Sequence, residues 1–287
     1  MVKLIAEIGL NYAYGDDSLE FLSNAKKLID LSVLAGFDYV KFQKRTPELC
    51  VPESQKEVEK VVPWRDKPTT YLQYKKDVEF SFDEYKLLVD YCRQKGIGVF
   101  VSVWDKESVD FWSDICTSYY DHMECIMKIP SAMVTNLDLC RYARERCEKL
   151  MVSTGMSTES EVTSCIHSCN PDVIFHTNSA YPTPVSDLNL GYINHLRRCY
   201  PDKEIGYSGH EFGLDTTIST VALGVEWIER HITLSHDLWG SDQRASIEPV
   251  GMFKLVKGVR ELESALQGDC FRVVYESELE KKKSLRG

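Results

Sequence analysis

The sequence lacks the features that mark membrane, secreted or nucleic-acid-binding proteins. No apolar run approaches the roughly 20 residues needed to cross a bilayer. The N-terminus reaches Glu7 too early for a signal peptide. Lysines and arginines are scattered and the net charge is −10, which argues against a basic surface for nucleic acid. We therefore expect a cytoplasmic protein with neither a membrane nor a nucleic-acid partner.

Disulfide signals are also missing. The ten cysteines form no Cys-x-x-Cys motif and no small-scaffold spacing, and they are spread through helix-like and strand-like segments. Reduced thiols are the expectation for such a chain. Cys165 and Cys169 lie four apart on a predicted helix and could bind a metal. Because no second pair supports this, the spacing favours a packing role.

Strand-like and helix-like segments alternate along the chain. The predicted strands are 4–11, 39–43, 99–103, 126–129, 150–154, 173–179, 205–208 and 227–232. The predicted helices are 19–35, 82–94, 107–115, 137–147, 159–168, 188–198, 215–223 and 250–266. Eight such pairs predict an α/β fold, the (β/α)8 TIM barrel. A doubly wound open sheet is the alternative, and it is disfavoured because no glycine fingerprint opens the first helix.

The expected domain is a single barrel over residues 1–270, because no internal repeat or second domain is visible. Residues 44–80, after the second strand, are too long for a plain connection. They are expected to form either a lid or a solvated insertion, with a short helix near 71–76. Residues 271–287 form a tail whose charged end, from Glu276, is expected to fray.

Two histidines end successive predicted strands, His210 and His231. Neighbouring parallel strands lie about 4.8 Å apart, so both imidazoles can reach one ion. Either histidine alone is more simply a polar residue at a strand end. The pair, with Asp242 close behind, favours a catalytic metal site whose remaining positions are open to water and substrate.

Other polar residues collect at the carboxyl ends of the predicted strands, the face at which barrel enzymes keep their sites. Lysine charges and serine hydroxyls together suit a phosphate and a carboxylate. The candidates are Glu7, Asn11, Lys41, Gln43, Ser102, Lys128, Ser131, Ser153, Thr154, Ser179, Tyr181, Ser208, His210, Glu229, His231 and Asp242.

Several stretches match one family in order. The chain resembles the sialic acid (N-acetylneuraminate) synthases, and more broadly the phosphoenolpyruvate-condensing nonulosonate synthases. The matching stretches are 6–11, 40–43, 128–131, 152–156, 177–184, 205–211, 228–233 and 240–249. The last three of these are together the most specific.

The resemblance implies a divalent metal, usually Mn2+ with Mg2+ or Co2+ as alternatives, held by His210 and His231. It implies that Glu7 lies near the metal and phosphoenolpyruvate. The phosphoenolpyruvate-binding set that it implies is Lys41, Ser102, Lys128, Ser131, Ser153, Ser179 and Ser208. The residues implied to face the acceptor sugar are Gln43, Tyr181 and Asp242.

The implied reaction joins phosphoenolpyruvate to an N-acyl hexosamine such as N-acetylmannosamine, giving a nonulosonic acid and phosphate. A phosphorylated acceptor could use Lys44 or Arg45. Glu7 is the candidate for directing water, or it supports the metal. Glu229 holds a sugar hydroxyl, supports the metal site or pairs with a lysine. Condensation with a different aldose, or a non-catalytic ligand-binding barrel, are the alternative functions.

The sequence departs from the family pattern in three places. Relatives carry an antifreeze-like module after the barrel, which donates an arginine to the partner subunit's sugar. The given sequence ends at Gly287, near the expected linker, and that module is not expected here; the resemblance still implies a homodimer. Met133 replaces a glutamate and Tyr12 a histidine, both expected on the acceptor side.

Overall fold

The computed structural model describes residues 1–287 apart from 16–17, 121–122 and 269–270. Its central sheet is a closed barrel of parallel strands in the order β1-β10-β9-β8-β7-β6-β5-β2. The (β/α)8 prediction is confirmed. The strands are β1 (Lys3–Gly9), β2 (Tyr39–Lys44), β5 (Gly98–Val103), β6 (Ile126–Ile129), β7 (Lys149–Ser153), β8 (Val173–Thr177), β9 (Glu204–Gly209) and β10 (Trp227–His231).

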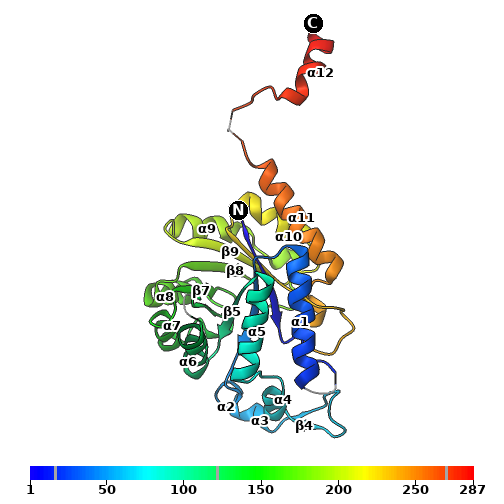
Figure 1. The fold of residues 1–287 in the computed structure, drawn as a ribbon. Coiled ribbons are helices and arrows are strands. Elements are labelled where there is room, and N and C mark those ends of the chain that lie inside the picture. The colour runs from blue at the N-terminus through cyan, green and yellow to red at the C-terminus, as the bar shows by residue number, and fades with distance from the viewer. Residues whose placement is uncertain (16–17, 121–122, 269–270) are drawn as a thin grey trace.

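Helices follow the strands and cover the outside of the barrel (Figure 1). Ser81 caps α5 through a capping box, and Thr158 does the same for α8. The helices are α1 (Ser18–Ala35), α5 (Phe82–Lys95), α6 (Lys106–Asp114), α7 (Leu137–Arg144), α8 (Glu159–Cys169), α9 (Gly191–Cys199), α10 (Asp215–Ser219) and α11 (Pro249–Ala265).

The barrel interior is filled by side chains below the site. Phe175 is fully buried, and a Cβ at Gly206 would lie 2.5 Å from its ring, so glycine at 206 makes room for it. The Lys128 ammonium lies 4.0 Å from the Phe175 ring centroid. The aromatic ring therefore forms part of the floor beneath Lys128.

The excursion after β2 is folded and packed. It contains α2 (Pro47–Cys50), α3 (Glu53–Lys56), β3 (Glu59–Lys60), β4 (Thr69–Thr70) and α4 (Tyr71–Asp77). Trp64 packs edge-on against Phe21 of α1 and Trp239 after β10, with centroid distances of 5.0 and 4.9 Å. Figure 1 shows these elements at the bottom, at the carboxyl ends of the strands. The excursion is thus fastened to the barrel through these aromatic contacts, while most of its side chains over 52–68 are exposed.

The C-terminal tail departs from the prediction of a frayed end, because residues Glu276–Arg286 form helix α12. The segment is rich in strong helix formers. The Glu278 carboxylate accepts a 3.0 Å hydrogen bond from the Tyr275 amide and pairs with Arg272 at 2.7 Å. These contacts stabilise the first turn. Across the described residues, no helix combines the length and apolarity needed to span a bilayer.

Candidate active site

Strand register places the predicted polar residues side by side at one end of the barrel. Glu7 of β1 lies opposite Lys41 of β2 on one side and His231 of β10 on the other. Ser102 of β5 lies opposite Lys128 of β6. Because neighbours in register point to the same side of a parallel sheet, these side chains share the barrel interior.

A cavity of about 230 Å³ opens among these residues. The site residues expected from the sequence line it except Asn11, Thr154 and Asp242. Asn11 is buried beside Ser246, Thr154 lines the neighbouring hollow, and Asp242 lies at the cavity edge, 4.0 Å from the His231 Nδ1 atom. Its lining residues are Glu7, Lys41, Gln43, Ser102, Trp104, Lys128, Pro130, Ser131, Ala132, Ser153, Met156, Thr177, Ser179, Tyr181, Ser208, His210, Glu229 and His231.

Lys41 is buried and paired. Its Nζ atom lies 2.7 Å from Glu7 Oε2 and 3.7 Å from Glu229 Oε1, and it donates a 2.8 Å hydrogen bond to Ser102. Burial opposes the charge, but the Glu229 and Glu7 carboxylates outweigh it and raise the pKa of Lys41. Lys41 is therefore a fixed positive charge in the cavity wall.

Lys128 is equally buried but is held differently. Its Nζ atom lies 2.8 Å from Glu229 Oε1, which also accepts a 3.1 Å hydrogen bond from Ser208. Burial, helped by Lys41, outweighs the attraction of Glu229 and lowers the pKa of Lys128 to about 8. Of the roles open for Glu229, the structure thus shows pairing with lysines. Two lysines and two carboxylates form a charge-balanced group.

Serine hydroxyls come close together where β6, β7 and β8 end. Gly155, after β7, makes this possible. A Cβ at Gly155 would lie 2.2 Å from Ser179 Oγ and 2.8 Å from Ser131 Oγ. Such distances require both hydroxyls to move, so the glycine keeps space for a small ring of donors beside the lysines.

The two histidines face each other across the cavity, with ring centroids 5.4 Å apart. His210 Nδ1 lies 2.6 Å from the Asn178 carbonyl oxygen, which orients the ring and leaves Nε2 facing Tyr181 at 3.0 Å. Burial, reinforced by His231, lowers the pKa of His210 to about 3. The ring is therefore neutral at physiological pH, the form that binds metals.

The histidine pair suits a divalent metal. Nδ1 of His231 is buried and has no hydrogen-bond partner among the described residues, as expected for an atom reserved for a ligand. Metal–nitrogen bonds of about 2.1 Å to one ion would separate two imidazole centroids by roughly 5 Å. His210 and His231 would supply two ligands, and the carbonyl behind His210 is a typical outer partner for a metal-binding ring.

The cavity rim next to β2 carries one of the two cations that the sequence offered for a phosphorylated acceptor. Arg45 contacts Gln43 Oε1, and its guanidinium lies 3.9 Å from the centroid of the Trp104 ring. Trp104, one residue beyond β5, was not among the site residues expected from the sequence. Its place at the carboxyl end of a strand could have identified it. Lys44 points away from the cavity, since Glu79 holds its ammonium at 3.0 Å. Only Arg45 of that pair therefore remains a candidate for a second phosphate.

The two acceptor-side departures expected from the family pattern lie outside the cavity. Tyr12 is buried, donates a 2.6 Å hydrogen bond to the Val78 carbonyl and stacks on Phe80. It fastens the excursion to the barrel. Met133 lines a separate surface hollow, and Ala132 lies in the central cavity instead. Neither residue lines the central cavity, because Tyr12 is packed in the core and the short helical turn after β6 directs residue 132 inward instead.

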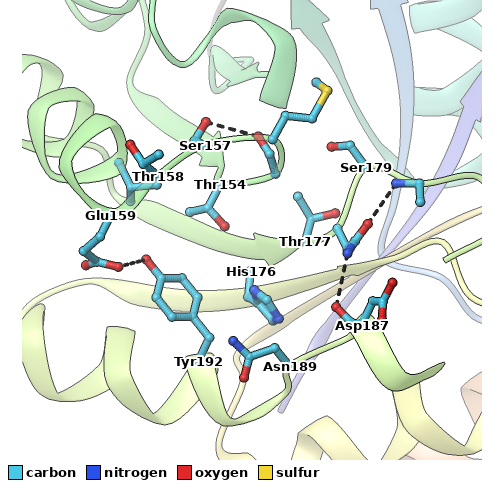
Figure 2. A pocket seen from close by; sticks show the side chains of 15 residues that line it. Thr154, Ser157, Thr158, Glu159, His176, Thr177, Ser179, Asp187, Asn189 and Tyr192 are labelled. Carbon is cyan, nitrogen blue, oxygen red and sulfur yellow. Dashed lines mark hydrogen bonds between the residues drawn. The ribbon is translucent and has the colours of Figure 1, made fainter. Parts of the chain in front are cut away.

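A second, larger hollow of about 720 Å³ lies beside the first, where β7 and β8 end (Figure 2). Thr177 and Ser179 border both cavities. Figure 2 shows Glu159 accepting a hydrogen bond from Tyr192, at 2.8 Å. The described lining contains no lysine or arginine. The smaller cavity, with its paired lysines and histidines, is thus the one equipped to bind an anion.

The fold and the site place this protein among the (β/α)8-barrel enzymes that keep their site at the carboxyl ends of the strands. The model of the NeuB family matches residues 28–270. The chain is 34% identical over 270 residues to the N-acetylneuraminate-9-phosphate synthase of Homo sapiens, covering 92% of this chain and 70% of that protein. It is 28% identical to the N,N'-diacetyllegionaminic acid synthase of Campylobacter jejuni, covering 96% and 80%.

A solved structure of a related enzyme has the same fold. The N-acetylneuraminic acid (sialic acid) synthetase of Leptospira borgpetersenii superposes with a TM-score of 0.81 at 28% identity, covering 99% of this chain and 92% of that one. The chain belongs to the NeuB family and is an enzyme of its synthase class.

Proposed function

We propose that the protein condenses phosphoenolpyruvate with an N-acyl hexosamine, N-acetylmannosamine or a relative, to give a nonulosonic acid and phosphate. The observation that carries this proposal is one cavity in which two buried lysines and several serine hydroxyls face two buried histidines. The names of the relatives, synthases of sialic and legionaminic acids, support the same product class.

Phosphoenolpyruvate binds against the lysines in this proposal. Lys41 and Lys128 offset the charges of its phosphate and carboxylate, and the hydroxyls beside Gly155 donate to its oxygens. Glu7 and Glu229 hold the two ammonium groups apart and in place before the substrate arrives. The site is thus organised in advance for an anion.

Replacing Gly155 with alanine tests the hydroxyl ring. The added Cβ displaces Ser179 and Ser131, so KM for phosphoenolpyruvate should rise roughly ten-fold, a loss of about 1.4 kcal/mol. Steady-state kinetics with phosphate detection measures it. Gly191→Ala is the matched control, because the nearest atom to its Cβ is 3.8 Å away. An unchanged KM in Gly155→Ala would show that these hydroxyls do not bind phosphoenolpyruvate.

The chemistry follows from the substrates. Carbon 3 of phosphoenolpyruvate forms a bond to the aldehyde carbon of the open-chain sugar, water adds at carbon 2, and C–O cleavage releases phosphate. A divalent metal held by His210 and His231, Mn2+ by family resemblance, would supply Lewis-acid stabilisation of the charge developing on the aldehyde oxygen. Tyr181 and Asp242, beside the histidines, orient the sugar.

Glu7 is the proposed acceptor for the proton that water loses. Its Oε1 accepts a 2.9 Å hydrogen bond from Gln43, and its Oε2 lies 2.7 Å from the Lys41 ammonium, so both oxygens are held in place. Gln43 in turn contacts Arg45 at the rim. This series of contacts links the water-directing carboxylate of Glu7 to the rim, the side from which the sugar enters.

A phosphorylated hexosamine is the second candidate acceptor. Arg45 lies at the rim. Burial lowers the pKa of nearby Lys75 to about 8, and the positive charge of Arg45 contributes to this shift. Among the described residues neither side chain forms an ion pair, although the Asp242 and Glu79 carboxylates act on Lys75 from farther away. Two neighbouring cations of this kind suit a phosphate. A different aldose is the competing acceptor.

Product mass spectrometry separates these functions. Phosphoenolpyruvate and Mn2+ are incubated with a mixture of N-acyl hexosamines, their 6-phosphates and plain aldoses. We expect one nonulosonic acid whose mass is the sum of the acceptor, phosphoenolpyruvate and water, less phosphoric acid. A plain aldose product would overturn the acceptor class. Binding of phosphoenolpyruvate with no product from any acceptor would overturn the proposed catalysis.

A further inference from the structure

Three buried cysteines meet between α7 and α8, outside the candidate active site. Cys140 comes from α7, and Cys165 and Cys169 come from successive turns of α8. Each is at most 2% exposed. The sequence spacing pointed only to the pair on α8 and therefore favoured packing. Helix packing supplies the third sulfur, which changes that interpretation.

The sulfur positions match those around a metal ion. The Sγ atoms of Cys140 and Cys165 are 3.7 Å apart, those of Cys165 and Cys169 are 3.9 Å apart, and all three lie within 4.8 Å of one another. Metal–sulfur bonds of about 2.3 Å place thiolates around one ion roughly 3.8–4.0 Å apart. Little movement of either helix is therefore needed for all three sulfurs to bind one ion.

The surroundings favour thiolate. Hydrogen bonds from Cys165 and Cys169 lower the pKa of Cys140 well below its ordinary value, and the charge of Arg141 adds to the effect. Arg144 places a second positive charge near Cys169. Metals bind cysteine as thiolate, so an ion bound by this cluster would release the protons of its thiols.

We propose that Cys140, Cys165 and Cys169 bind one thiophilic d10 cation, for which Cu+ is the best match. Within the described chain, no further His, Cys, Asp or Glu joins the cluster as a fourth ligand. Soft thiolates bind both Cu+ and Zn2+, but Zn2+ in structural sites takes four ligands, so a set of three sulfurs favours Cu+. The ion cross-links α7 to α8, the helices that follow the strands carrying Lys128 and Ser153.

Metal titration of the whole, reduced protein under anaerobic conditions tests this site. Cu+ is delivered against a chromophoric competitor, and Cd2+ serves as a spectroscopic probe. We expect one equivalent of each, with the ultraviolet charge-transfer absorption of metal–thiolate bonds, and protection of these three cysteines from alkylation. Imidazole does not give that absorption, so the histidine pair cannot imitate the result. The experiment is independent of the proposed synthase activity.

Single variants locate the ligands. Cys140→Ser and Cys165→Ala should each weaken Cu+ binding at least ten-fold and remove most of the absorption. Cys92→Ala is the matched control, since Cys92 is also buried and free but lies on α5. Peptide mapping of the alkylated wild type covers the case in which a variant fails to fold. No thiolate absorption in the wild type, or equal binding in Cys140→Ser, would overturn the proposal.

Discussion

Replacing His210 or His231 with alanine should reduce the rate of phosphate release by at least about a thousand-fold, or roughly 4 kcal/mol of transition-state stabilisation. Either substitution removes one of the two ring nitrogens proposed to hold the divalent metal. Because both ligands serve one ion, the double variant should be no slower than either single variant. Coupled phosphate detection in the presence of Mn2+ measures the rates.

The histidine variants need structural controls, since each removes local contacts. His210→Ala loses its hydrogen bonds to Asn178 and Tyr181, at a cost of about 1 kcal/mol each. Circular dichroism should therefore show a folded barrel with a modestly lower Tm. His167→Ala, on the exposed side of α8, is the matched histidine control and should keep full activity. Wild-type rates in both site variants would remove the metal from the mechanism.

The barrel could be predicted because its signals are local. Apolar runs of strand length alternate with amphipathic segments, and this order permits few other folds. The cavity could be predicted nearly as well, since all parallel strands end at the same rim, so Lys41, Lys128 and His231 had to meet there. Asp242, from a loop, is less constrained and lies at the edge instead of in the lining.

Side-chain partners could not be read from the sequence. The pairing of Glu229 with Lys128 depends on strands that are 101 residues apart, and it emerges only when the barrel closes. Met133 and Tyr12 lie outside the cavity lining because one helical turn, or one buried aromatic contact, rotates a residue away from it. The cysteine cluster was missed for the same reason, since its third sulfur comes from a neighbouring helix.

Replacing Lys128 with methionine should raise KM for phosphoenolpyruvate about a hundred-fold, equivalent to roughly 2.7 kcal/mol, with a smaller change in kcat. Methionine has a similar length but cannot supply the buried positive charge and hydrogen bond that an anion needs. The change also leaves Glu229 with fewer partners and should lower Tm. Adding Glu229→Gln to the variant should recover stability without recovering KM, which separates binding from folding.

The pH dependence gives an independent test of the same lysine. Lys128 is charged below its pKa of about 8 and neutral above it, so kcat/KM for phosphoenolpyruvate should fall as pH rises through that value. Lys128→Met should lose this step, because nothing titrates at that position. Lys203→Met, a lysine of the barrel surface paired with Asp202, should retain it. A step of the same height in Lys128→Met would assign the titration to another group and leave Lys128 without its proposed role in capturing the anion.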